Sequence, residues 1–183
     1  SGKMFLAGLD RLWPERPPLL LYGFSGGAHF ASRFVAWAPA RVKGWVAYAA
    51  GWWDEPRPTA AGTPDPPGVI VCGELDSRRD ATAGFFRAGR VVGKPWLWIG
   101  IAGNDHDADP RIGAWVRRYF AGILAGAPGK WVEVPKDAEN SAPPLQGWLA
   151  VKDMEPAWRA LCTAPPDDNN ATKMEEETDE EKE

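Results

Sequence analysis

The chain has 183 residues, of which 44% are hydrophobic and 25% are charged, and this is enough for one folded domain with its own core. The net charge of −4 is unevenly spread, because residues 166–183 hold nine acidic side chains and two lysines and the rest of the chain is close to neutral. The arginines are scattered, so no basic face predicts nucleic-acid binding. Because no apolar run is long enough to span a bilayer and the first ten residues show no leader pattern, we expect a cytoplasmic protein without membrane contact.

Short apolar runs alternate along the chain with segments that have helical periodicity. In chain order, the segments with helical periodicity are 4–13, 28–38, 81–92 and 111–124. The apolar runs that predict strands are 19–24, 42–50, 69–72 and 95–101. This alternation predicts βα units in an α/β fold, a mostly parallel sheet with helices on both faces.

The pattern divides the chain into three parts. Residues 1–127 contain the βα units, and residues 128–165 form an irregular extension in which 131–134 and 147–151 could pair as a small hairpin. Residues 166–183 have no apolar periodicity, so we expect this acidic tail to be disordered.

The first expected strand runs into Gly23-Phe24-Ser25-Gly26-Gly27 and then into a helix. A serine in a G-x-S-x-G turn between a strand and a helix has a strained backbone that lifts its hydroxyl above the sheet. We expect Gly23 and Gly27 to leave out side chains that would collide with this turn. The pentapeptide also occurs by chance, so the flanking strand and helix favour Ser25 as nucleophile, with the Gly26 backbone N–H as an oxyanion donor.

A hydrolase serine needs a base and an acid that orients the base, and the chain has only two histidines. His29 lies four residues after Ser25 on the following helix, where we expect a packing or surface role. His106 follows the last expected strand, at the carboxyl edge of the sheet where ligands bind. Asp76 follows the third strand and is our expected acid, while Glu74 lies nearer the strand and is the alternative. The resulting order, serine, aspartate, histidine, is that of α/β-hydrolases.

Metal binding is the competing interpretation of the loop around the base. Asp105, Asp107 and Asp109 alternate as in a calcium loop, but Pro110 stands where glycine is needed and Val116 where a bidentate glutamate is needed. The two cysteines form neither a disulfide framework nor a metal-binding spacing. We therefore expect no metal.

Three aromatic residues lie near the expected site. Phe24 precedes the nucleophile, and we expect it to contact substrate. Trp52 and Trp53 follow the second expected strand and have two alternatives, a wall of the substrate pocket or a cap over the core.

With these residues placed, residues 4–124 resemble the α/β-hydrolase family, near the dienelactone-hydrolase-like esterases. The resemblance rests on Gly-Phe-Ser-Gly-Gly, on Val-Ile-Val-Cys-Gly-Glu-Leu-Asp and on Gly-Asn-Asp-His, where the family usually has Gly-x-Gly-His. It implies that strands 5 to 8 of an eight-stranded fold are present, and that the first four strands and the early loop supplying another oxyanion N–H are missing. The first strand would then be an open apolar edge.

These observations predict a serine hydrolase that cleaves a small-molecule carboxylic ester through an acyl-enzyme on Ser25, without a cofactor. Acyl transfer and peptide hydrolysis use the same residues and stay open. The alternative is a non-catalytic hydrolase-like fragment or interaction module that needs its missing N-terminal half, a second copy or another chain along the open edge.

Overall fold

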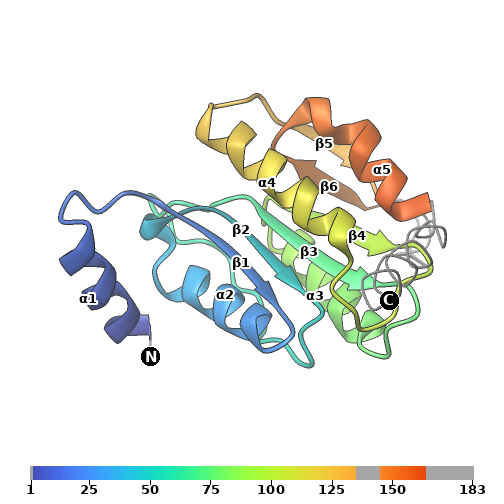
Figure 1. Cartoon of the computed structure of the whole chain (residues 1–183), viewed down its shortest axis with the longest axis horizontal. Coiled ribbons are helices and arrows are strands. Elements are labelled where there is room, and N and C mark those ends of the chain that lie inside the picture. The colour runs from blue at the N-terminus through green and yellow to red at the C-terminus, as the bar shows by residue number, and fades with distance from the viewer. Residues whose placement is uncertain (1, 135–144, 164–183) are drawn as a thin grey trace, which may run out of the picture.

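The computed structural model describes residues 2–134 and 145–163 (Figure 1). Four strands form one parallel sheet in the order β1-β2-β3-β4. Their bounds are Leu19–Phe24 (β1), Val42–Tyr48 (β2), Gly68–Gly73 (β3) and Trp96–Ile101 (β4). The mostly parallel sheet predicted from the apolar runs is confirmed.

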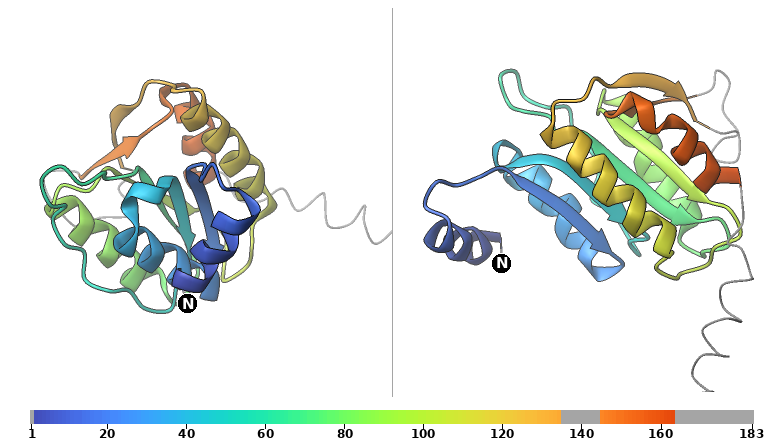
Figure 2. Two further views of the ribbon diagram at one scale, coloured as in Figure 1. Left: turned by 90° about the vertical axis from the view of Figure 1, so that its left-hand side faces the viewer. Right: turned by 45° about the horizontal axis from the view of Figure 1, so that its top comes forward.

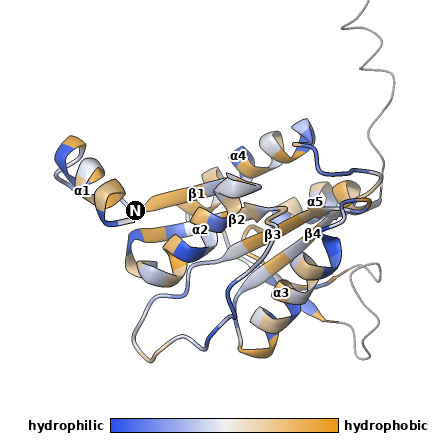
Figure 3. Ribbon diagram, turned by 90° about the horizontal axis from the view of Figure 1, so that it is seen from below, coloured by the Kyte–Doolittle hydropathy of each residue, from blue (hydrophilic) through white to orange (hydrophobic). Residues whose placement is uncertain are grey.

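Helices cover both faces of this sheet, as predicted (Figures 2 and 3). Helices α2 and α3 pack on one face, and α4 and α5 pack on the other. The helices are α1 (Gly2–Leu12), α2 (Gly26–Trp37), α3 (Arg79–Val91), α4 (Pro110–Leu124) and α5 (Glu155–Thr163), with single 3-10 turns η1 (Pro39–Arg41) and η3 (Lys152–Met154).

The core lies between the sheet and these two helix layers. Every residue of β3 is buried, and β2 is buried except at Lys43, because both faces of these central strands are covered. Hydrophobic colouring runs along the strands of the sheet (Figure 3). The carboxyl ends of the four strands lie at one edge, which brings the loops that follow them together.

The sheet has an open side at β1, which pairs only with β2 within the described part of the chain. Helix α1 lies beside α2 and contacts it through the Phe5 ring, 5.5 Å from each of the Phe30 and Phe34 rings. None of the residues of α1 is buried. The N-terminal side of the molecule therefore carries exposed aromatic and aliphatic surface.

Residues after α4 form a separate two-stranded antiparallel sheet. Strands β5 (Lys130–Glu133) and β6 (Gln146–Leu149) pair with each other, and β6 contacts β4. The expected acidic tail, residues 166–183, lies outside the described residues. In the described ranges no helix is long and apolar enough to cross a bilayer, and no group of three acidic, histidine or cysteine side chains could hold a metal ion.

Candidate active site

Ser25 occupies a strained turn between β1 and α2. Its backbone has φ 50° and ψ −114°, a conformation that non-glycine residues rarely adopt. A Cβ built on Gly23 would lie 2.1 Å from the carbonyl oxygen of Gly27, so the strand can only enter this turn through a glycine. A Cβ on Gly27 would meet nothing within 4 Å, so the expectation that both glycines are sterically required is wrong for Gly27.

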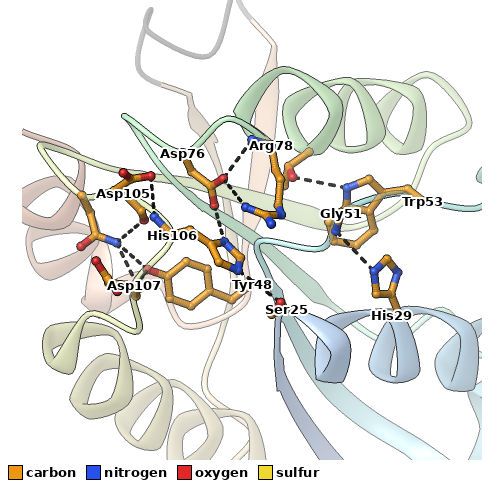
Figure 4. Close-up of polar contacts among 12 residues, drawn as sticks. Ser25, His29, Tyr48, Gly51, Trp53, Asp76, Arg78, Asp105, His106 and Asp107 are labelled. Carbon is orange, nitrogen blue, oxygen red and sulfur yellow. Dashed lines mark hydrogen bonds and ion pairs between the residues drawn. The ribbon is translucent and has the colours of Figure 1, made fainter.

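His106 faces this serine from the loop after β4 (Figure 4). Its Nε2 atom lies 3.2 Å from Ser25 Oγ, and its Nδ1 atom lies 2.8 Å from Asp76 Oδ2. With the proton on Nδ1, the ring donates to the carboxylate and its Nε2 accepts from the serine hydroxyl. The three residues predicted from the sequence are thus brought together in one hydrogen-bonded chain.

The Asp76 carboxylate is buried, and both of its oxygens are hydrogen bonded. Oδ2 accepts from His106, while Oδ1 accepts from the backbone N–H of Arg78 at 2.9 Å and from its guanidinium at 3.2 Å. Burial acts to raise the pKa of this carboxyl, but the hydrogen bonds from Arg78 and His106 outweigh it and hold the pKa below its usual value. Glu74, the alternative acid, instead accepts from the backbone N–H of Gly103 at 2.8 Å.

A polar network anchors the loop that carries His106. The buried Asn104 amide donates to the Tyr48 hydroxyl at 2.8 Å and to the Asp107 carbonyl at 2.9 Å. Burial raises the pKa of Tyr48, so its hydroxyl stays protonated and donates to the same Asp107 carbonyl at 2.5 Å. A Cβ on Gly73 would lie 2.4 Å from the Asn104 carbonyl oxygen, which shows how closely the loop approaches the end of β3.

Three of these supporting residues are missed by the sequence reasoning: Tyr48, Arg78 and Asn104. Arg78 follows the expected acid by two residues, and Asn104 precedes the expected base by two, so their positions in the chain offered a signal. Tyr48 lies far from both in sequence, and its role follows only from the pairing of β1 with β2.

The remaining residues expected at the site are Gly26, the expected oxyanion donor, and three aromatic residues. Gly26 is exposed and begins α2, where backbone N–H groups have no acceptor inside the helix. The Phe24 ring stacks on the His106 ring at 5.0 Å between centroids. Trp53 stacks on Phe85 of α3 at 4.3 Å and is partly buried, so its contacts favour the cap over the core.

His29 lies on the other side of Ser25 from His106 (Figure 4), and its ring contacts Trp52. The His29 ring lies 4.8 Å from the Trp52 ring, and its Nε2 accepts from the Gly51 backbone N–H at 3.3 Å. The Arg33 guanidinium lies over the Trp52 ring, 4.1 Å from its centroid. His29 therefore has a packing role, while Trp52 remains 48% exposed on the loop after β2.

Cys72 is not a competing nucleophile in this region. It is fully buried in β3, and burial raises the pKa of its thiol to about 12. The thiol therefore stays protonated and unreactive at neutral pH. Ser25 Oγ, in contrast, lies within hydrogen-bonding distance of the His106 ring.

Two solved serine hydrolases from Staphylococcus aureus have a similar arrangement of elements. The S-formylglutathione hydrolase FrmB is 14% identical with a TM-score of 0.43, over 58% of this chain and 49% of that one. The fluorophosphonate-binding serine hydrolase FphF is 14% identical with a TM-score of 0.46, over 67% of this chain and 62% of that one. This chain thus spans about half to three fifths of their lengths. No protein-family model and no curated protein matches the chain.

Proposed function

We propose that this chain is a serine hydrolase that cleaves carboxylic esters through an acyl-enzyme on Ser25. The observation that carries the proposal is the continuous chain of hydrogen bonds from the buried Asp76 carboxylate through His106 to Ser25 Oγ. A serine hydroxyl is a weak nucleophile by itself, and it becomes reactive when an oriented base can take its proton.

In the proposed reaction, Ser25 Oγ attacks the ester carbonyl while its proton moves to His106 Nε2. The new negative charge develops on the carbonyl oxygen beside the Gly26 N–H at the start of α2, where the helix dipole also favours it. His106 then gives the proton to the departing alkoxide, which leaves as an alcohol. A water molecule, deprotonated by His106, cleaves the acyl-enzyme and releases the acid, and the proton returns to Ser25.

Gly26 supplies only one oxyanion donor in this scheme. In the family that the motifs resemble, a second donor comes from a loop before the strand equivalent to β1. Loss of one such donor costs about 3 kcal/mol of transition-state stabilisation. We therefore expect slow ester turnover by this chain alone, and faster turnover when a neighbouring segment along β1 completes the site.

Fluorophosphonate labelling tests the proposal without knowledge of the natural substrate. The chain is treated with the probe and analysed by mass spectrometry, together with the Ser25→Ala variant and a control, Ser32→Ala, on the same helix. We expect one adduct on Ser25 that is lost in Ser25→Ala and retained in Ser32→Ala, because the Ser32 hydroxyl bonds only the His29 carbonyl among the described contacts. An unlabelled wild-type chain, or labelling that persists in Ser25→Ala, would contradict the proposal.

A second candidate function is an interaction module that binds another chain along β1. It is favoured by the side of β1 that pairs with no strand among the described residues, and by exposed aromatic side chains on β1 and α2, namely Tyr22, Phe30 and Trp37. Sedimentation of the wild-type chain tests it: a concentration-dependent dimer that Tyr22→Lys converts to a monomer supports it, and a monomer at all concentrations counts against it.

A further inference from the structure

A cation contacts the acid of the proposed catalytic group from the side opposite the base. Arg78 bonds Asp76 Oδ1 twice, through its backbone N–H and through its guanidinium, while His106 takes Oδ2. Within the described residues, Arg78 is the only lysine or arginine that forms an ion pair with Asp76. The carboxylate has no exposed surface, whereas the Arg78 side chain is 36% exposed.

This geometry fixes the direction in which the carboxylate points. Asp76 and Arg78 form a local turn in which the side chain of the first residue accepts from the backbone of the second. A carboxylate held at Oδ1 by two donors cannot rotate about its Cβ–Cγ bond without breaking both. Oδ2 is thereby aimed at the Nδ1 atom of His106, which in turn aims Nε2 at Ser25.

The guanidinium also places a positive charge next to the acid–base pair. Opposite charges at this distance favour the ionised form of the Asp76 carboxylate. Figure 4 shows Arg78 between Asp76 and the loop at Gly51. Its Nε atom lies 3.9 Å from the place that a Cβ on Gly51 would occupy, so the side chain is confined between the acid and that loop.

We propose that Arg78 is a positioning residue that orients the Asp76 carboxylate and thereby aims the His106 ring at Ser25. The proposal rests on the proposed function of Ser25. It goes beyond the serine, acid and base because it assigns the activation of the serine partly to a residue that contacts neither Ser25 nor His106 through a described hydrogen bond.

The test compares fluorophosphonate labelling rates and p-nitrophenyl acetate hydrolysis across pH for the wild type and for Arg78→Gln, Arg78→Met and Arg78→Lys. The matched control is Arg118→Gln, the same change at an exposed arginine of α4. We expect the two neutral variants to label about 10- to 100-fold more slowly, the range associated with misplacement of a catalytic group. Arg78→Lys should recover part of the labelling rate, because an ammonium group can still donate to Asp76 Oδ1, and Arg118→Gln should leave the rate unchanged.

The remaining outcomes separate this proposal from that of the site itself. No labelling of the wild type would overturn the proposed function, and the role of Arg78 with it. A labelled wild type with unchanged neutral variants would overturn only the role of Arg78. A decrease that Arg78→Lys does not relieve would indicate mere structural support, and a raised KM with unchanged kcat would indicate a substrate contact, so each also overturns it. Urea transitions show which variants fold, and the methionine variant keeps the aliphatic packing if glutamine does not.

Discussion

The two outer glycines of the Ser25 turn should respond in opposite ways to the same substitution. A methyl group added at Gly23 would lie 2.1 Å from the Gly27 carbonyl oxygen and 2.2 Å from its carbonyl carbon. These are backbone atoms, so the clash cannot be relieved by rotating a side chain. A methyl group at Gly27 meets nothing within 4 Å, and the residue lies in the first turn of α2.

The expected magnitudes follow from these surroundings. Overpacking of a well-packed site costs about 1–3 kcal/mol, and we place Gly23→Ala at or above the upper end because main-chain atoms must move. Replacing a helical glycine by alanine stabilises by about 0.5–1 kcal/mol, and somewhat less in the first turn. Gly23→Ala should therefore lower the free energy of unfolding by about 3 kcal/mol, whereas Gly27→Ala should leave it equal or slightly higher.

Urea unfolding followed by tryptophan fluorescence measures both variants against the wild type, and fluorophosphonate labelling reports the turn directly. Gly8→Ala on α1 is the internal control, because a Cβ there also meets nothing within 4 Å and the residue lies outside the proposed site. We expect Gly23→Ala to lose labelling at Ser25 even under conditions in which it is folded. Equal destabilisation by Gly23→Ala and Gly27→Ala would refute the reasoning, because it would mean that the turn needs both glycines for a reason other than space.

Three further results are expected from the same turn and loops. Gly73→Ala should slow labelling at least tenfold, because its Cβ would lie 2.4 Å from the Asn104 carbonyl oxygen and would displace the loop that carries His106. Unchanged labelling would contradict this prediction. Asn104→Leu should lower the free energy of unfolding by about 1–3 kcal/mol in urea titrations, because it removes the buried amide that donates to the Tyr48 hydroxyl and to the Asp107 carbonyl, and Tyr48→Phe should add little to it if the two act as one network. Because the pKa of Asp76 is lowered in the fold, its ionisation stabilises the protein above about pH 4 and this stabilisation is lost as the pH falls below that; acid titration of the free energy of unfolding should therefore be flatter in Asp76→Asn than in the wild type.

The sheet could be predicted from the sequence because its strands are buried on both faces. Each appears as a short continuous apolar run between a proline- or glycine-rich turn and a helical pattern, so the runs and the strands coincide to within a residue or two. β1 was matched residue for residue over Leu19–Phe24. The ends of β2 were less well predicted, since Ala49 and Ala50 continue the apolar run but Ala49 has φ 53° and leaves the strand.

The proposed acid and base could be located because parallel strands bring their carboxyl ends to one edge. Position in the chain then restricts the choice to the few polar residues directly after β3 and β4. The choice of Asp76 over Glu74 followed from distance to the strand, and the contacts of the two carboxylates agree with it.

Other parts of the site depend on side-chain direction, which the sequence does not carry. The requirement for Gly27 was inferred by symmetry about Ser25, but the chain turns into α2 after the serine and the Cβ position of Gly27 faces open space. Trp52 and Trp53 are adjacent in sequence yet pack on different helices, α2 and α3. From the sequence alone, the Arg78 side chain could as readily point to solvent as toward Asp76.

Tyr48 explains how the nucleophile and the base keep their separation. Its backbone carbonyl accepts from the Ser25 N–H at 2.8 Å, and its hydroxyl holds the loop of His106 through Asp107 and Asn104. One residue at the end of β2 therefore sets both ends of the 3.2 Å contact between Ser25 and His106.

The open side of β1 bears on which parts of the proposed site this chain holds by itself. All the described contacts that hold the proposed serine, acid and base come from β1 to β4 and the segments that follow them. A neighbour along β1 is thus not needed to bring the three groups together, whereas the resemblance to α/β-hydrolases implies that it would supply a second oxyanion donor. The two steps should therefore separate: this chain alone should react with fluorophosphonate at Ser25, while ester turnover should rise when the segment across the open edge is supplied. Labelling that itself requires that segment would show that the edge also shapes the turn at Ser25.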